Sequence, residues 1–244
     1  MHVIFSFILG AIIGSFLNVV IYRLPSIMIG ERITLSYPAS FCPHCGAGIR
    51  WRHNLPLLGW LSLGGRCADC RNPIPWRYPL VELLTALLFA LLTQRYGLSL
   101  QGGFILAAAC LLVTLAGIDL RTMLLPDRLT LPLWALGACA AFMDAGRVSG
   151  MEAMTASALG FMLPWLLDRL FYLWRRQPGM GMGDMKLFAA LGAWFGVETL
   201  WRIMAISPLL AMFSALLVLR TKLGERFPFG PYPIAVALVF MIWR

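Results

Sequence analysis

Apolar residues form long continuous runs along this chain, and short polar stretches separate the runs. Continuous runs are typical of helices that cross a bilayer, whereas barrel strands alternate between apolar and polar residues. We expect eight runs to span, of which the sixth and eighth are short: 3–23, 79–96, 102–118, 129–145, 151–174, 185–197, 200–220 and 229–243. The predicted fold class is an all-α polytopic membrane protein with about eight transmembrane helices.

Composition supports this class, because the chain is 60% hydrophobic and 13% charged, against about 25% charged residues in soluble domains. The first run lacks a basic segment before it and a small-residue cleavage site after it. It is therefore predicted to be a retained helix and not a signal peptide. Three domains follow from the pattern: a first transmembrane helix at 1–23, a polar loop domain at 24–78, and a multi-helix transmembrane domain at 79–244.

The net charge of +9 is informative mainly through the positions of the basic residues along the chain. The basic residues are scattered at the ends of the apolar runs and form no stripe, so no nucleic-acid partner is expected. Placing the 24–78 loop in the cytoplasm puts 16 of the 20 Lys and Arg residues on the cytoplasmic side. This bias predicts that both termini lie outside and that Asp119 and Asp184 lie at the cytoplasmic face.

Two Cys-x-x-Cys pairs in the polar loop are separated by 21 residues: Cys42 with Cys45, and Cys67 with Cys70. Two such turns can supply four thiolates to one tetrahedral zinc ion, so a zinc-ribbon-like domain is predicted. Redox thiols are an alternative, as are disulfides if the topology is inverted, although a reducing cytoplasm disfavours disulfides. His44 or His53 could replace one ligand.

Four thiolates would leave no open position for water, which favours a structural zinc ion over a catalytic one. The sequence has no His-Glu-x-x-His motif and no Gly-x-Ser-x-Gly motif, which disfavours a zinc metalloprotease and a serine hydrolase. Cys110 and Cys139 lie within predicted spans, where they are expected to be small buried apolar residues.

Asp119 and Asp184 each lie at the edge of a long apolar run, in a chain with only 11 acidic residues. Each could simply cap a helix or pair with Arg121 or Lys186, and Asp184, which precedes an apolar run and follows three spaced glycines, could be an N-cap. The functional alternative is a pair that shares one proton, in which one carboxylate activates water and the other donates to a carbonyl oxygen. Asp127 is a third candidate for a catalytic acid, but it follows a proline at the start of a span, where a helix N-cap is the simpler prediction.

The segment Gly181 to Lys186 reads Gly-x-Gly-Asp-x-Lys, and glycines before the acid would let an extended substrate backbone lie close. It resembles the signature of the bacterial type IV prepilin peptidases, within the wider Gly-x-Gly-Asp family of intramembrane aspartyl proteases. Further stretches resemble that family in the same order along the chain: residues 14–25, the two cysteine pairs, 77–82, 118–120 with 125–127, and 229–232.

This resemblance implies Asp119 and Asp184 as the catalytic pair, with Gly181, Gly183 and Lys186 supporting the substrate or the loop. It implies that the cysteines form the zinc or structural loop. Arg121 stands where relatives often have another polar or acidic residue, which makes the local field more positive.

The resemblance also implies a substrate, a type IV prepilin or type II secretion pseudopilin, cleaved after a glycine on the cytoplasmic side of the bacterial inner membrane. Many such enzymes then methylate the new amine with S-adenosylmethionine, for which no binding motif is evident here. The alternatives are a proton- or cation-coupled transporter that uses the two acids, and an assembly factor without enzymatic activity. The sequence does not determine the oligomeric state.

Overall fold

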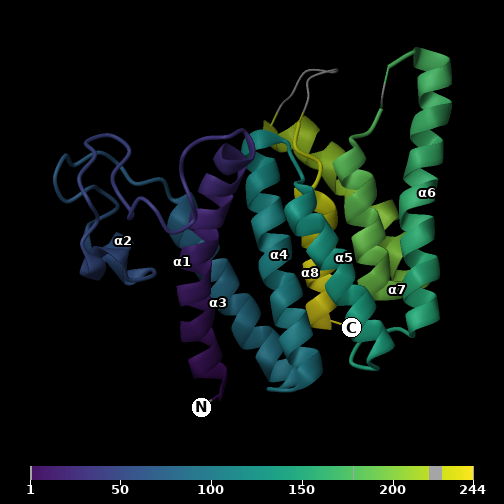
Figure 1. Ribbon diagram of the computed structural model, residues 1–244, viewed down its shortest axis with the longest axis horizontal. Coiled ribbons are helices and arrows are strands. Elements are labelled where there is room, and N and C mark those ends of the chain that lie inside the picture. Colours follow the sequence, from purple (N-terminus) through teal and green to yellow (C-terminus); the bar gives the residue numbers. More distant parts are fainter. Residues whose placement is uncertain (1, 178, 220–226, 244) are drawn as a thin grey trace. The chain divides into compact units, whose positions relative to one another are not determined.

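The computed structural model describes residues 2–177, 179–219 and 227–243. Most of these residues form helices, and loops connect the helices (Figure 1). Their pairing in β geometry is limited to two isolated bridges, Phe41 with Gly48 and Arg66 with Pro73. Four cationic residues used in the charge count, Arg220, Lys222, Arg226 and Arg244, lie outside the described residues. The chain divides into two compact units, 1–97 and 98–244.

The first unit contains two long helices and the polar loop between them. Its elements are α1 (His2–Met28), the 3₁₀ turn η1 (Trp51–Asn54), the short α2 (Leu58–Ser62) and α3 (Arg77–Tyr96). Glycines let α1 and α3 approach closely, since a Cβ on Gly10 would lie 2.7 Å from the Phe89 Cβ. Small residues at helix contacts are typical of packing in membranes, where lipid competes with apolar side chains. The predicted domain division grouped 79–96 with the later helices, whereas α3 packs on α1.

The described residues of the second unit form five α-helices. They are α4 (Leu100–Thr122), α5 (Asp127–Phe142), α6 (Gly150–Arg175), α7 (Met182–Phe213), which continues as the π-helix η2 (Ser214–Leu219), and α8 (Pro231–Trp243). Helices α6 and α7 lie side by side (Figure 1). Their backbones touch at two glycines, because a Cβ on Gly160 would lie 2.5 Å from the Phe188 carbonyl oxygen and one on Gly192 would lie 2.5 Å from that of Ala156.

Among the described residues, three helices are long and apolar enough to cross a membrane: His2–Met28, Leu100–Thr122 and Met182–Leu216. The all-α class is therefore confirmed. The sixth predicted span lies within α7, and the seventh starts in α7 and continues into η2, with residue 220 outside the described residues. Gly196 has non-helical backbone angles (φ 71°, ψ 179°) and divides α7 into two parts. The count of eight transmembrane helices stays a prediction, since α8 is only 13 residues long.

The helix ends of the second unit gather at two opposite ends of the bundle. The Asp119 carboxylate, in the last turns of α4, accepts a hydrogen bond from Gly230, just before α8, and Lys186 in α7 pairs with Asp127 at the start of α5. At the other end, Arg147 donates to the carbonyl oxygens of Phe240 and Met241 in α8. The end of α4 and the starts of α5, α7 and α8 therefore share one end of this unit.

Candidate active site and metal centre

The four cysteines lie in two turns of the same design. Cys42 N–H donates to Ala47 and Gly46 N–H to Cys42, while Cys67 N–H donates to Asn72 and Arg71 N–H to Cys67. Each turn is closed by one of the two isolated bridges, which flank the cysteines at the same offsets. The fifth residue of each turn has a left-handed backbone, Gly46 in the first (φ 72°) and Arg71 in the second (φ 60°). The backbone thus presents both cysteine pairs in the same way.

The sulfur atoms of Cys42, Cys45, Cys67 and Cys70 all lie within 4.8 Å of one another, and those of Cys42 and Cys70 are 3.8 Å apart. A tetrahedral zinc ion with Zn–S bonds of about 2.3 Å would separate its sulfur ligands by about 3.8 Å. The cluster therefore fits a single metal ion. Neither His44 nor His53 belongs to this cluster of the described residues, which disfavours a histidine ligand.

Two of these thiols have shifted acidities. Backbone N–H groups of Cys45 and His44 donate toward the Cys42 sulfur and lower the pKa of Cys42 to about 6. The Asn72 N–H lowers the pKa of Cys70, but partial desolvation and the three neighbouring sulfur atoms outweigh it and raise that pKa to about 12. Four negative charges repel one another at these distances. A bound cation removes this repulsion and favours the thiolate form of all four groups.

The other two cysteines differ from expectation. Cys139 in α5 is exposed in the protein's own packing, and Cys110 in α4 is half-buried. The prediction that both are buried is therefore wrong for Cys139. Position within a span does not imply burial, because helices at the edge of a bundle leave one side to the lipid.

Asp119 lies within α4, three residues before its end, and only 4% of the residue is exposed. The backbone N–H of Gly230 donates to its Oδ2 at 2.9 Å. A Cβ on Gly230 would lie 3.0 Å from that oxygen and 3.2 Å from Cδ2 of Leu125. Glycine is therefore the residue that allows this approach, and the chain before α8 covers the carboxylate.

Asp184 is the third residue of α7 and is half-buried. Gly181, and not Asp184, is the N-cap residue of α7, so the alternative in which Asp184 is the N-cap is wrong. A Cβ on Gly183 would lie 2.9 Å from the Cβ of Leu125, so Leu125 contacts the chain next to both acids. The Asp119 and Asp184 carboxylates are close enough to interact electrostatically.

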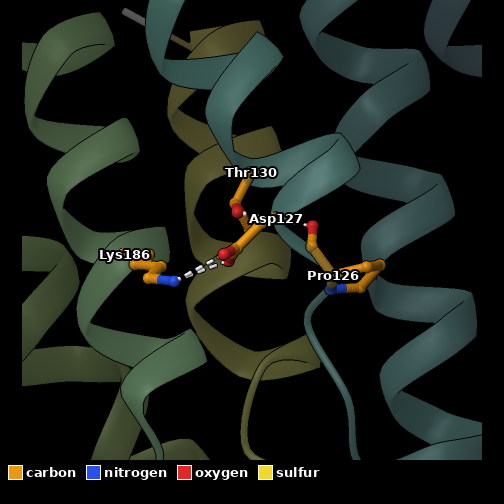
Figure 2. A network of polar contacts seen from close by, with 4 residues as sticks. All are labelled: Pro126, Asp127, Thr130 and Lys186. Atoms are coloured by element: carbon orange, nitrogen blue, oxygen red, sulfur yellow. Dashed lines mark hydrogen bonds and ion pairs between the residues drawn. The ribbon is translucent and has the colours of Figure 1, made fainter. Parts of the chain in front are cut away.

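Lys186 pairs with Asp127 and not with either of these acids among the described ion pairs. Figure 2 shows the Lys186 Nζ facing both carboxylate oxygens of Asp127, each at 2.7 Å. Asp127 starts α5, whose N-cap residue is Pro126, so the prediction that Asp127 is an N-cap is wrong. This ion pair ties the first residue of α5 to the fifth residue of α7, two positions after Asp184.

Two contacts were not foreseen from the residues. The Gly230 amide reaches Asp119 from 111 residues away, and its only local signal is a Phe-Gly-Pro sequence before an apolar run. In the first unit, the buried Glu82 of α3 accepts a hydrogen bond from Leu57 N–H at 2.7 Å and so ties the polar loop to that helix. A glutamate within an apolar run was the available signal for the second contact.

Two protein families match consecutive regions that together cover most of the chain. Residues 8–96 match the family described as "Bacterial Peptidase A24 N-terminal domain", and residues 105–219 match the "Type IV leader peptidase family". The chain belongs to the type IV leader peptidase family. The two matched regions meet between residues 96 and 105, and the two compact units of this leader peptidase meet at residues 97 and 98, so the two divisions of the chain agree.

Curated relatives of this leader peptidase family member carry one name, "Prepilin leader peptidase/N-methyltransferase". The protein from Neisseria gonorrhoeae is 40% identical, over 92% of this chain and 84% of its own length. That from Aeromonas hydrophila is 40% identical over 97% and 89%. That from Klebsiella pneumoniae is 47% identical over 80% and 86%. No solved structure matches the chain.

Proposed function

We propose that this protein is a membrane-embedded aspartyl endopeptidase that removes the leader of type IV prepilins or type II secretion pseudopilins and then methylates the new N-terminal amine. Membership of the leader peptidase family and the names of its relatives support both activities. The observation that carries the assignment to residues is the approach of two acids from different helices. Asp119 is buried beneath Gly230, and Asp184 lies within electrostatic reach of it.

Asp119 and Asp184 would divide the work of hydrolysis between them. The ionised carboxylate takes a proton from water, whose oxygen adds to the carbonyl carbon of the leader's last glycine, while the protonated carboxyl donates to the carbonyl oxygen of that glycine. The tetrahedral intermediate then breaks its C–N bond, and the departing amine receives a proton from an acid. The Gly230 N–H supports this role by holding one Asp119 oxygen in a fixed place.

Gly181 would leave room for an extended substrate backbone beside Asp184, since a Cβ there would meet the Asp184 Oδ2 at 3.3 Å. Gly183 would support the loop instead, because a Cβ there would lie 2.9 Å from the Leu125 Cβ, so that glycine lets the start of α7 pack against Leu125. Lys186 supports the same turn through Asp127.

We propose that the four cysteines bind one structural zinc ion in a cytoplasmic loop domain at 24–78. Cys42, Cys45, Cys67 and Cys70 would hold it, and four thiolate ligands would supply folding stability without a position for reacting water. The methyl donor for the second activity would be S-adenosylmethionine, which would supply an electrophilic methyl group for the new amine. No residues are assigned to it.

The proposed topology has eight spans in the bacterial inner membrane, with the large loop and both acids at the cytoplasmic face. It is supported by the Lys and Arg distribution and by the gathering of Asp119, Asp127 and Gly230 at one end of the second unit. Reporters fused within 30–75 or after Arg175 should behave as cytoplasmic, and one fused near Arg147 as external. An external signal after Arg175 would contradict the topology.

The decisive experiment is cleavage of a prepilin by the full-length protein in membranes. Asp119→Asn and Asp184→Asn should each lower the rate by about 10²–10⁴-fold, because an amide cannot exchange the proton, while protein in the membrane stays constant. Asp127→Asn is the matched control and should keep much of the activity, since it makes the same change at an acid that pairs with Lys186. Substantial cleavage by Asp184→Asn would refute the mechanism, and wild-type protein that moves ions but leaves prepilin intact would favour a transporter.

A further inference from the structure

Asp168 of α6 holds the loop that leads into α7. Its Oδ1 accepts hydrogen bonds from two successive backbone N–H groups, Gly179 at 2.7 Å and Met180 at 3.0 Å. Hydrogen bonds to an ionised carboxylate are shorter and stronger than those between neutral groups. Two of them on one oxygen define both the position and the direction of the backbone at this point.

Helix α6 also limits how closely this loop can approach it. Phe171 is three residues beyond Asp168, on the same side of α6. A Cβ on Gly179 would lie 2.9 Å from the Phe171 Cδ1, so this part of the loop rests against the ring. Asp168 thus draws the loop toward α6, and Phe171 limits how far it can move.

The loop continues directly into the turn that carries Asp184. Gly181 follows Met180 and is the N-cap residue of α7. The Asp184 N–H donates to the Gly181 carbonyl oxygen at 3.1 Å, and a Cβ on Gly181 would lie 3.3 Å from the Asp184 Oδ2. The backbone held by Asp168 is therefore one residue away from the backbone that contacts the acid.

Joining α6 to α7 does not require Asp168. The two helices already touch through Gly160 and Gly192, well before the end of α6. Loss of the Asp168 bonds would release the connecting loop and leave the helix pair packed. The consequence would be local and would fall on the first turn of α7.

We propose that Asp168 is a positioning residue for peptide cleavage, which sets the place of the Asp184 carboxylate through Gly179, Met180 and Gly181. The inference rests on the proposed catalytic role of Asp184. Displacing a catalytic group by about 1 Å can cost about 100-fold in rate, so a released loop would lower turnover. Substrate affinity would change little, because Asp168 contacts the loop and not the substrate.

The test compares kcat and KM for prepilin cleavage by the full-length protein and its variants. Asp168→Ala removes the acceptor and should lower kcat by about 10- to 100-fold with KM within about threefold. Asp168→Asn keeps an oxygen that accepts both N–H groups and should stay within about threefold of the unmodified protein in kcat. Asp168→Leu keeps the branched shape of the side chain without an acceptor, so its kcat should fall as much as that of Asp168→Ala. If the Ala variant does not fold, the Leu variant replaces it in the test. Asp144→Asn, which neutralises an exposed acid in the loop before α6, should change neither constant.

Amide hydrogen exchange gives a readout that is independent of activity. Exchange in 179–184 should accelerate in Asp168→Ala and Asp168→Leu but not in Asp168→Asn, while exchange in the packed parts of α6 and α7 stays unchanged in all three.

Three outcomes would overturn the proposal: normal kcat in Asp168→Ala and Asp168→Leu, an Asn variant as impaired as Ala, or a raised KM as the main effect. The last would mean that the Asp168 charge contacts the substrate. If Asp184→Asn is inactive and Asp168→Ala is normal, only the positioning role fails. If Asp184→Asn still cleaves, the catalytic assignment itself fails.

Discussion

The cysteine cluster of the first unit and the aspartate pair of the second unit are assembled in different ways. Each cysteine pair lies in a short turn whose hydrogen bonds are made within six residues, and the two turns repeat one backbone design. The aspartates lie on two helices, and the contact that holds Asp119 comes from the start of a third helix, 111 residues away. One site depends mainly on local geometry and the other mainly on packing.

This difference determines where each site is sensitive to substitution. In the cysteine cluster, the ligands themselves and the left-handed turn residues should dominate. In the aspartate site, residues with no chemistry of their own should matter almost as much as the acids, because glycines such as Gly183 and Gly230 set the distances between helices. The following variants test this contrast.

Removing two ligands should have the largest effect. Cys42→Ser combined with Cys45→Ser should reduce bound zinc from about one ion per chain to none, since the apparent binding free energy of structural zinc is about 10–16 kcal/mol and needs all ligands. Elemental analysis of purified protein measures this. Cys139→Ser, outside the cluster, should keep its zinc. Four alkylatable thiols and no metal in a gently prepared sample of the unmodified protein would instead favour redox thiols.

A methyl group on Gly230 should be the next most damaging change. The added Cβ would meet the Asp119 Oδ2 at 3.0 Å and should displace it, lowering the cleavage rate by about 10- to 100-fold. Gly103→Ala is the matched control in α4, where a Cβ would meet nothing within 4 Å; it should keep full activity and raise stability by up to about 1 kcal/mol. Equal rates in the two variants would mean that packing around Asp119 is not critical.

Breaking the ion pair between α5 and α7 should have a modest effect. The side chains of Lys186 and Asp127 are 32% and 55% exposed, and such pairs contribute about 0–1 kcal/mol. Asp127→Asn should therefore keep much of the cleavage activity. A double-mutant cycle with Lys186→Gln, followed by thermal unfolding in detergent, should give a coupling below about 1 kcal/mol. Inactivity comparable to that of Asp184→Asn would assign Asp127 to the catalytic group instead.

The smallest expected effect is a gain in the stability of the cysteine loop. Arg71 has the left-handed backbone that Gly46 has in the matching turn, and this conformation costs a side-chain-bearing residue about 1–2 kcal/mol. Part of this cost is offset by the greater freedom of glycine in the unfolded chain. Arg71→Gly should therefore stabilise the loop by about 0.5 kcal/mol and slow zinc release to a chelator. Gly46→Ala should speed release, and a faster release from Arg71→Gly would contradict the argument.

The sequence alone predicted the elements of this protein well. Helix positions follow from apolar runs, because burial in lipid or in a bundle selects long apolar segments wherever they occur. The cysteine cluster was predictable for a similar reason, since a Cys-x-x-Cys turn is closed by its own backbone. The two aspartates were identifiable because carboxylates in apolar runs are rare.

Tertiary structure decided which groups those elements bring together. No local pattern indicates that Gly230 donates to Asp119, that Lys186 pairs with Asp127 instead of a candidate catalytic acid, or that Asp168 holds the loop before Asp184. Each contact joins residues from different elements and exists only after the helices pack. Local propensity acts over a few residues, whereas these contacts depend on how glycines and small side chains let distant helices approach.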